Sequence, residues 1–277
     1  MDKRALNLGI HLSYDKQLTL SGSSSSKGNQ PKWKMGVDWY KGDYMGYEGL
    51  AEVYVSEMLK HSNVNSYVKY YPVDITCGDN FYTGCFSLDF LDNYEELITI
   101  ERLHVLTRGK PLVKELDRIP SIKNKILYTV SFLEEETGLK GVGEYLTALL
   151  ELDALFLNED RHTNNIAIIR NTKTKQFRFC PYFDFGLSLL SDTSAYPLNL
   201  FSVEKAISSV KAKPFSSSFD SQVSAARSLY GSQVRFNLPN RFLLDLKEKY
   251  QSYYDTDVLN RAVETLIYQI SHNKDMF

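Results

Sequence analysis

Residues 158 to 169 read Asn-Glu-Asp-Arg-His-Thr-Asn-Asn-Ile-Ala-Ile-Ile, and residues 181 to 186 read Pro-Tyr-Phe-Asp-Phe-Gly. The run that precedes the first stretch, residues 144–157, carries leucine on nearly every face of a helix. A helix that is apolar all round is a buried one, so we expect a central helix that ends in a polar loop. The loop leads into an apolar run, which predicts a strand.

A hairpin is expected to join the two stretches, because apolar runs at 166–169 and 177–183 flank a polar connection. A turn centred near residue 174 would place Asn165 opposite Asp184, about 5 Å away. An amide oxygen and a carboxylate are ligands that Mg²⁺ uses together with phosphates. We therefore predict that Asn165 and Asp184 bind a metal ion.

Asp160 lies five residues before Asn165, just outside this predicted metal pair. A carboxylate in that place can accept the proton of a hydroxyl group or orient the nucleophile. The alternative interpretation is structural: residues 160–162 would form a polar cap at the end of the helix, and Asp184 would be an ordinary turn aspartate.

The composition excludes several other classes of protein. The chain has 277 residues, of which 43% are hydrophobic and 13% aromatic, so it can bury a substantial core. A net charge of −2 gives no indication of a nucleic-acid or anionic-membrane surface. Three cysteines without a Cys-x-x-Cys pair favour a reducing compartment. No long apolar run and no apolar core near the N-terminus are present, so we expect a cytoplasmic protein without a membrane segment.

The patterning changes along the chain at about residue 92. Residues 1–91 contain strand-like runs at 31–35, 64–73 and 82–90, a glycine-containing segment at 36–49 interpreted as a loop, and one amphipathic helix. In that helix Ala51, Val55, Met58 and Leu59 share a buried stripe. Residues 92–277 are mostly helical. We expect an α+β fold with a β-rich domain (1–91) and a larger helical domain (92–277).

The combination Asp-Arg-His-x-x-Asn, a hairpin and Asp-Phe-Gly resembles two related groups, the HipA-like protein kinases and the phosphatidylinositol 3-kinase-like enzymes. The residues before Asp184, a tyrosine and a phenylalanine, favour the HipA-like group, because the lipid kinases usually have a histidine there. This resemblance implies a bilobal kinase fold that uses ATP and Mg²⁺. It also implies that Asp160 is the catalytic base, that Asn165 and Asp184 hold Mg²⁺, and that Arg161 and His162 brace the loop.

The N-terminal domain should then supply the ATP contacts. A serine-rich loop at 21–28 is expected to cover the phosphates with Ser23, Ser24 and Ser25, or else to be a flexible linker. Lys34 is predicted as the ATP lysine, with Lys32 on the same strand face as the alternative. Its predicted partner is Glu52, since a carboxylate at the edge of an apolar stripe is costly unless paired.

Three further expectations concern the rest of this domain. The backbone of Ser87, Leu88 and Asp89 is predicted to bind adenine, because these residues end the last strand. Glu57 is predicted to be solvated, on the outer side of the helix. Autophosphorylation is predicted within Ser23–Ser26, where the added negative charge would repel ATP.

The expected function is that of a HipA-like serine/threonine protein kinase acting on a protein substrate. The resemblance also implies the toxin of a toxin–antitoxin system, with a separately encoded antitoxin partner. The alternatives are a lipid or small-molecule kinase, which needs an enclosing site, and a nucleotide-binding pseudokinase. The full set of Asp160, Asn165 and Asp184 argues against a pseudokinase, which typically lacks at least one such residue.

Overall fold

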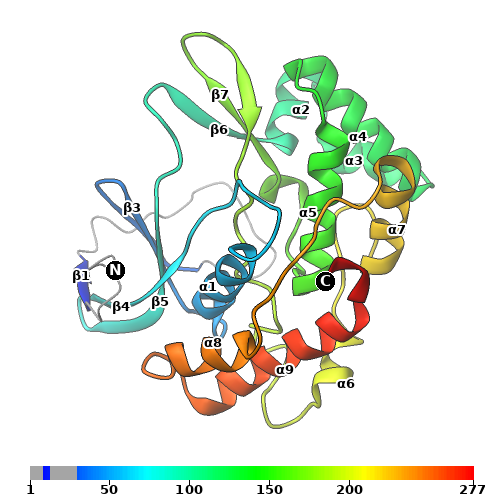
Figure 1. The fold of residues 1–277 in the computed structure, drawn as a ribbon. Helices are drawn as coiled ribbons and strands as arrows, with labels where there is room; N and C mark the ends of the chain where they lie inside the picture. The colour runs from blue at the N-terminus through cyan, green and yellow to red at the C-terminus, as the bar shows by residue number, and fades with distance from the viewer. Residues whose placement is uncertain (1–8, 13–29) are drawn as a thin grey trace. The chain divides into compact units, whose positions relative to one another are not determined.

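The computed structural model describes residues 9–12 and 30–277 (Figure 1). The chain forms two compact units. The first unit joins the residues up to Asp89 with Phe183–Ser209 and Arg235–Phe277, and the second joins Phe90–Tyr182 with Val210–Val234. The predicted boundary after residue 91 is close to the break after Asp89, but each unit also takes in segments that are distant in the sequence.

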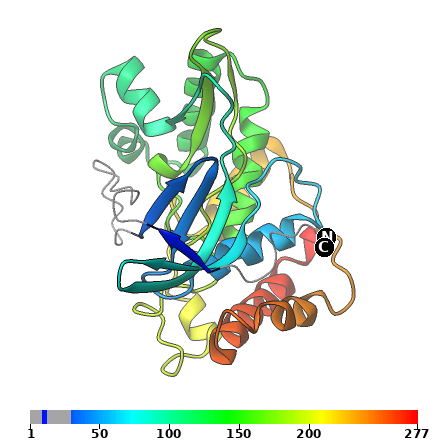
Figure 2. The ribbon, with the colours of Figure 1, turned by 90° about the vertical axis from the view of Figure 1, so that its left-hand side faces the viewer.

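The first unit contains a five-stranded sheet with the order β1-β4-β5-β3-β2, seen in Figure 2. Strands β1 and β4 are parallel, and the other neighbours are antiparallel. The bounds of the strands are β1 Ile10–Leu12, β2 Lys32–Met35, β3 Asp38–Gly42, β4 Tyr71–Cys77 and β5 Asn80–Leu88.

Strand β3 corrects the interpretation of residues 36–49 as a loop. Met35 pairs with Asp38, so Gly36 and Val37 form a two-residue turn between β2 and β3. Gly36 has φ of 63°, which a glycine adopts without a steric penalty and which such hairpin turns require. The glycine therefore marks a tight hairpin turn. The expected strand at 64–73 is also wrong for most of its length, because β4 begins only at Tyr71.

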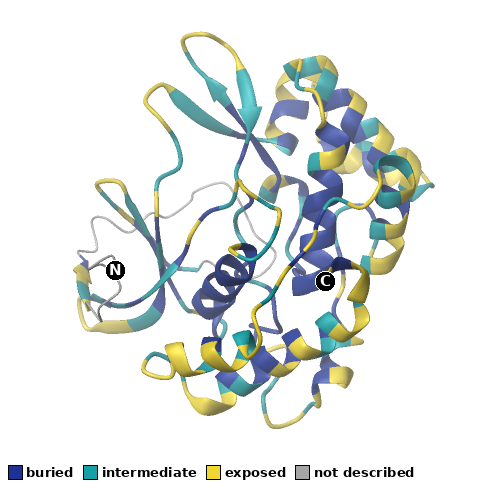
Figure 3. Ribbon diagram, viewed as in Figure 1, coloured by how far each residue is buried: buried dark blue, intermediate teal, exposed yellow. Residues whose placement is uncertain are grey.

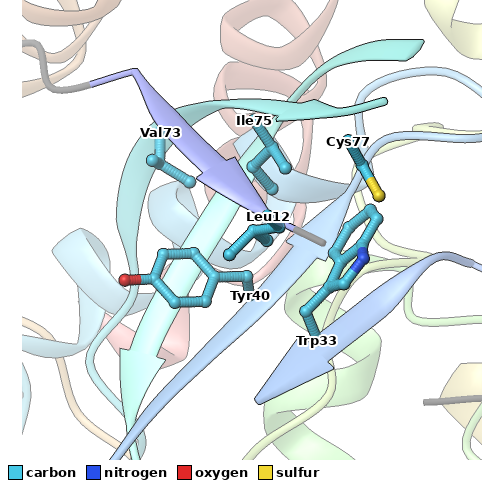
Figure 4. Packing of buried hydrophobic residues seen from close by; sticks show 6 residues of the cluster. All are labelled: Leu12, Trp33, Tyr40, Val73, Ile75 and Cys77. Carbon is cyan, nitrogen blue, oxygen red and sulfur yellow. The ribbon is translucent and has the colours of Figure 1, made fainter. Parts of the chain in front are cut away.

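Apolar side chains from alternate positions of these strands form the core on one face of the sheet. Figure 4 shows the buried cluster, in which the side chains of neighbouring strands point toward one another. Trp33 and Ile75 are completely buried, and the other members shown are Leu12, Tyr40, Val73 and Cys77.

Helix α1 (Glu48–Leu59) is buried along its entire length, as Figure 3 shows. The prediction that Glu57 is solvated is wrong. Its Oε1 accepts hydrogen bonds from the hydroxyl of Tyr250 at 3.0 Å and from Lys249 at 3.0 Å, both on α8 (Phe242–Tyr250). A chain segment almost 200 positions away therefore covers the face of α1 that the local pattern assigned to solvent.

The remaining helical elements of the first unit follow the Asp-Phe-Gly stretch and close the chain. They are α6 Val203–Ile207, α9 Thr256–His272 and the short 3-10 helix η4 Lys274–Met276. Arg261 on α9 donates to the backbone oxygens of Leu198 and Phe201, each at 2.7 Å, so α9 fixes the segment that precedes α6.

The second unit is mainly helical, and α5 lies at its centre. The prediction of a buried helix is confirmed, since α5 is buried at nearly every position. The helices of this unit are α2 Ile100–Arg108, α3 Leu112–Arg118, α4 Ile122–Thr137, α5 Val142–Phe156, the 3-10 helix η3 Thr163–Asn165 and α7 Phe219–Tyr230. In the part of the chain that the structure describes, no helix is both long enough and apolar enough to cross a membrane.

A three-stranded antiparallel sheet in this unit has the order β6-β7-β8, with β6 at Glu95–Thr99, β7 at Ala167–Asn171 and β8 at Phe177–Phe179. The expected hairpin is present, but its register differs from the prediction. A ladder that paired Asn165 with Asp184 would place Ile168 opposite Pro181. Ile168 instead pairs with Phe179, two positions earlier in the sequence. Strand β8 also ends at Phe179, so the ladder does not extend to residue 184.

Arg178 on β8 links this sheet to the first residues of the second unit. Its guanidinium donates to both carboxylate oxygens of Glu95, at 2.7 and 2.6 Å, and to the backbone oxygen of Phe90 at 3.0 Å. Hydrogen bonds from Arg178 are the main cause that lowers the pKa of Glu95 to about 2. Phe90 directly follows the predicted adenine-binding residues. Its backbone oxygen is therefore held by an arginine that is itself fixed by charge-assisted hydrogen bonds to Glu95.

We expect Glu95→Gln to destabilise the protein by about 1 kcal/mol at neutral pH, a modest value because Arg178 is partly exposed. The pKa of Glu95 in the folded protein lies below its ordinary value of about 4.3. The stabilisation is thus complete above that value and is lost as the pH falls through about 2. Urea unfolding at several pH values tests this. Glu96→Gln is the matched control, and an equal loss in both variants would contradict the assignment.

Candidate active site

In the first unit, Lys41 on β3 contacts two carboxylates. Its Nζ lies 2.6 Å from Oε1 of Glu52 on α1 and 2.8 Å from Oδ1 of Asp184. The side chain of Glu52 is completely buried, whereas that of Asp184 is 23% exposed. Lys41 is also 3.5 Å from the hydroxyl of Tyr70. One ammonium group thus joins a strand, a helix and the Asp-Phe-Gly stretch.

Charge pairing dominates the electrostatics of this cluster. Burial alone would lower the pKa of Lys41, but the carboxylates of Asp184 and Glu52 outweigh it and raise that pKa well above its ordinary value. Burial raises the pKa of Glu52, and Lys41 opposes that shift. A buried lysine flanked by two carboxylates is accordingly a stable cation in this unit.

Two glycines allow α1 to approach the sheet closely enough for this contact. A Cβ on Gly49, in the first turn of α1, would lie 2.6 Å from the backbone carbon of Gly84 on β5. A Cβ on Gly84 would in turn lie 2.0 Å from the backbone oxygen of Lys41. Neither position has room for a side chain, so the small residues set the distance between Glu52 and Lys41.

Asp184 is held by its own backbone conformation and by its neighbour. Its φ of 62° lies in the left-handed region, which aspartate tolerates better than most residues. The amide of Phe185 donates to Oε2 of Glu52 at 2.9 Å. Glu52 therefore contacts Lys41 with one oxygen and fixes the backbone beside Asp184 with the other.

The predicted Lys34–Glu52 pair is wrong. Lys34 Nζ lies 2.6 Å from Oδ2 of Asp89, and its side chain is 40% exposed. Lys41 takes the place next to Glu52 because β3 is the inner strand of the hairpin and β2 is at the edge of the sheet. Lys32, the alternative, pairs in the ladder with Lys41 and lies on the same edge strand.

The predicted adenine segment lies at the end of β5. The amide of Asp89 donates to the backbone oxygen of Val37 at 2.7 Å, and Leu88 pairs with Asp38. Because hydrogen bonding alternates along an antiparallel pair, the backbone groups of Leu88 face away from β3. The pairing of β5 with β4 ends at Phe86, so β4 does not cover that side of Leu88. Ser87 is buried in the sheet.

In the second unit, Asp160 lies in the loop after α5, and its carboxylate is surrounded by polar side chains. Oδ2 accepts from Nδ2 of Asn165 at 3.3 Å and lies 3.7 Å from Nε2 of His162. Oδ1 accepts from Nζ of Lys213 at 3.3 Å. The side chain of Asp160 is 13% exposed, so it keeps some access to solvent.

Arg161 acts as the brace of this loop and is completely buried. Its Nε donates to both carboxylate oxygens of Asp153 on α5, at 3.1 and 3.0 Å, and Nη1 donates to the backbone oxygen of Asn165 at 2.9 Å. Because its guanidinium is enclosed, Arg161 positions the loop and is not placed to contact a substrate.

Asn165 has a geometry that suits a cation ligand. Its Nδ2 donates to the backbone oxygen of Asp160 at 2.9 Å and to the Asp160 carboxylate, so the amide oxygen points away from Asp160. Across residues 9–12 and 30–277, no group of three or more histidine, cysteine, aspartate or glutamate side chains is arranged to hold a metal ion. Mg²⁺ bound with phosphates uses only one or two carboxylates from the protein, so a cluster of three such side chains is not required for it.

Ser23, Ser24 and Ser25 lie outside the described residues, so the phosphate-loop and autophosphorylation predictions have no structural counterpart here. Two residues that sequence reasoning missed are Lys41 and Lys213. The adjacent aromatic residues Trp39 and Tyr40, which are enriched in strands, follow Gly36 and were an available signal for the first. No local pattern predicts the contact of Lys213 with Asp160, which is 53 positions away in the sequence.

We expect Gly49→Ala to destabilise the protein by about 1–3 kcal/mol, because the new methyl group would meet the backbone of Gly84. Helix propensity alone predicts the opposite, a gain of about 1 kcal/mol. Equilibrium unfolding in urea separates the two effects. A variant as stable as the parent chain would show that the close approach of α1 to β5 is not required.

Comparisons with known proteins reveal the fold. No protein-family model matches the sequence, and no curated protein matches it. Among solved structures, a Helicobacter pylori proinflammatory kinase, CtkA, matches with a TM-score of 0.62 at 12% identity, over 97% of this chain and 96% of that chain. The predicted fold class is confirmed: the chain has a kinase-like α+β fold.

Proposed function

We propose that the chain is an ATP- and Mg²⁺-dependent phosphotransferase, a HipA-like serine/threonine protein kinase. The observation that carries this proposal is the contact of Lys41 with both Glu52 and Asp184. A lysine fixed by a helix glutamate, beside a metal-binding aspartate, is the arrangement with which kinases handle ATP phosphates. Lys41 and Glu52 lie outside the motif from which the resemblance was drawn, so their contact adds support that the motif does not contain.

Each residue has a distinct part in the proposed reaction. Lys41 would contact phosphate oxygens of ATP, and the exposed backbone edge of Leu88 would bind adenine. Asp184 and Asn165 would provide oxygen ligands for Mg²⁺, which neutralises charge on the phosphates when bound. Asp160 would accept the proton of the acceptor hydroxyl as that oxygen bonds to the terminal phosphorus of ATP and the bond between this phosphorus and ADP breaks. Arg161, enclosed with Asp153, would keep the loop in shape.

The finer features of the proposal rest on the sequence resemblance. A protein substrate, cytoplasmic location, a toxin role with a separately encoded antitoxin partner, and regulation by autophosphorylation at the serine loop stay predictions. The kinase CtkA is described as proinflammatory, and that property belongs to the Helicobacter pylori protein.

We expect Lys41→Met to reduce phosphoryl transfer by at least about 10²-fold, because a preorganised charge at the phosphates is lost. Lys34→Met is the matched control, since Lys34 is a partly exposed lysine of the same hairpin, and it should retain activity. Asp160→Asn should lose about 10²–10⁴-fold in kcat and keep its affinity for ATP. The assay uses γ-labelled ATP, Mg²⁺ and a peptide library with serine, threonine or tyrosine acceptors, with the protein itself as a further acceptor.

Two results would contradict the proposal. If the unmodified chain transferred no phosphate to any peptide or to itself, the assignment as a protein kinase would fail. If Lys34→Met lost as much activity as Lys41→Met, the contact with Glu52 and Asp184 would not identify the ATP lysine.

A further inference from the structure

Lys213 approaches Asp160 from a segment far along the chain. Its Nζ lies 3.3 Å from Oδ1 of Asp160, and among the described lysine and arginine side chains it is the one that forms an ion pair with that carboxylate. The side chain of Lys213 is 36% exposed. An ammonium group has three donors, so it can contact Asp160 and still direct donors elsewhere.

The backbone that carries Lys213 is firmly anchored within the second unit. Phe215 is 2% exposed, and the amide of Ala212 donates to the backbone oxygen of Ser217 at 3.1 Å. Gln222 on α7 is completely buried and donates to the backbone oxygen of Lys213 at 3.2 Å. The position of Lys213 is therefore fixed by packing and hydrogen bonds on both sides.

The helix that follows this segment is tied to α5, the helix that leads into the Asp160 loop. Arg227 on α7 forms an ion pair at 2.5 Å with Glu151 on α5, whose side chain is completely buried. Glu151 also accepts from the amides of Gln233 and Val234, at 3.0 and 2.8 Å. These contacts fix the position of the segment that carries Lys213 relative to the loop that carries Asp160.

The Asp160 loop itself offers no exposed guanidinium or ammonium group. Arg161 is completely enclosed and donates to Asp153 and to the backbone of Asn165. Phosphoryl transfer places negative charge on the three equatorial oxygens of the transferred group, and a fixed cation next to them stabilises the transition state.

We propose that Lys213 is a catalytic residue that contacts the transferring phosphoryl group while holding the carboxylate of Asp160. This inference rests on the proposed phosphotransferase function and adds a residue to it. Lys213 supplies the cation from the segment 210–218, because Arg161, the arginine of the Asp160 loop, has a structural role.

A chemical probe tests the location of Lys213 without relying on turnover. An acyl-phosphate derivative of ATP places an acyl carbon next to the terminal phosphate. A nearby lysine amine attacks that carbon, forms an amide and releases ATP. Mass spectrometry should find Lys213 acylated, and excess Mg-ATP should reduce this labelling at least about 10-fold by occupying the site. Lys211, an exposed lysine of the same segment, is the control and should show no protection.

Kinetics test the role of the residue. Lys213→Met should reduce kcat by about 10–10²-fold. This reduction is smaller than that expected on loss of a fully enclosed donor, because the side chain of Lys213 is partly exposed. The KM for ATP should change little, and Lys213→Arg should recover much of the loss. Lys211→Met should behave like the parent chain, and urea unfolding should be unchanged in all three variants.

The outcomes separate this inference from the function on which it rests. If calorimetry shows no binding of Mg-ATP and no transfer occurs, both fall. If the chain binds and transfers phosphate but Lys213 is unprotected, or Lys213→Met keeps its kcat, the inference alone is overturned. A loss of kcat that accompanies an equal loss of stability, without recovery in Lys213→Arg, would make Lys213 structural and would also overturn it.

Discussion

The contact of Lys41 with Glu52 and Asp184 is the constraint on which the first unit depends. A buried ammonium group is costly unless carboxylates compensate it, and removal of one partner from such a cluster typically costs about 3–5 kcal/mol. Here the two carboxylates come from α1 and from the segment after residue 182. Strand, helix and Asp-Phe-Gly stretch must therefore fold together for any of the three charges to be satisfied.

Packing on two sides of α1 keeps this cluster in place. On the sheet side, Gly49 and Gly84 permit backbone contact. On the other side, the hydroxyl of Tyr250 donates to Glu57 at 3.0 Å. Asp43, which precedes α1, accepts from the hydroxyl of Tyr254 at 2.9 Å and from the amide of Gly49 in the first turn of α1. Tyr250 and Tyr254 thus help to hold α1 in the position in which Glu52 meets Lys41. A helix that is buried on every face has little freedom to rotate away, so the ion pair is a fixed feature of the unit.

The sequence predicted the parts of the site that are local and missed those that are not. Asp160, Arg161 and Asn165 lie within six residues, so spacing alone was sufficient to bring them together. Lys41 was missed because Gly36 was taken as a sign of a long loop, although it forms a hairpin turn. The predicted register failed because the turn brings Phe179 opposite Ile168, and the ladder also ends early because β8 is only three residues long. The burial of Glu57 depends on α8, and no pattern within α1 could have revealed it.

The two ion pairs of the Asp160 loop differ in their surroundings, and that difference suggests a division of roles. Asp153 and Arg161 are completely enclosed, and burial raises the pKa of Asp153 even against the arginine. Such a pair fixes geometry, because either charge alone would be severely destabilised. The side chains of Asp160 and Lys213 are partly exposed, so each keeps room to contact a substrate group while it stays paired with the other. Precise positioning of a reacting group requires rigid support behind it. Here the enclosed pair Asp153–Arg161 supports the accessible pair Asp160–Lys213.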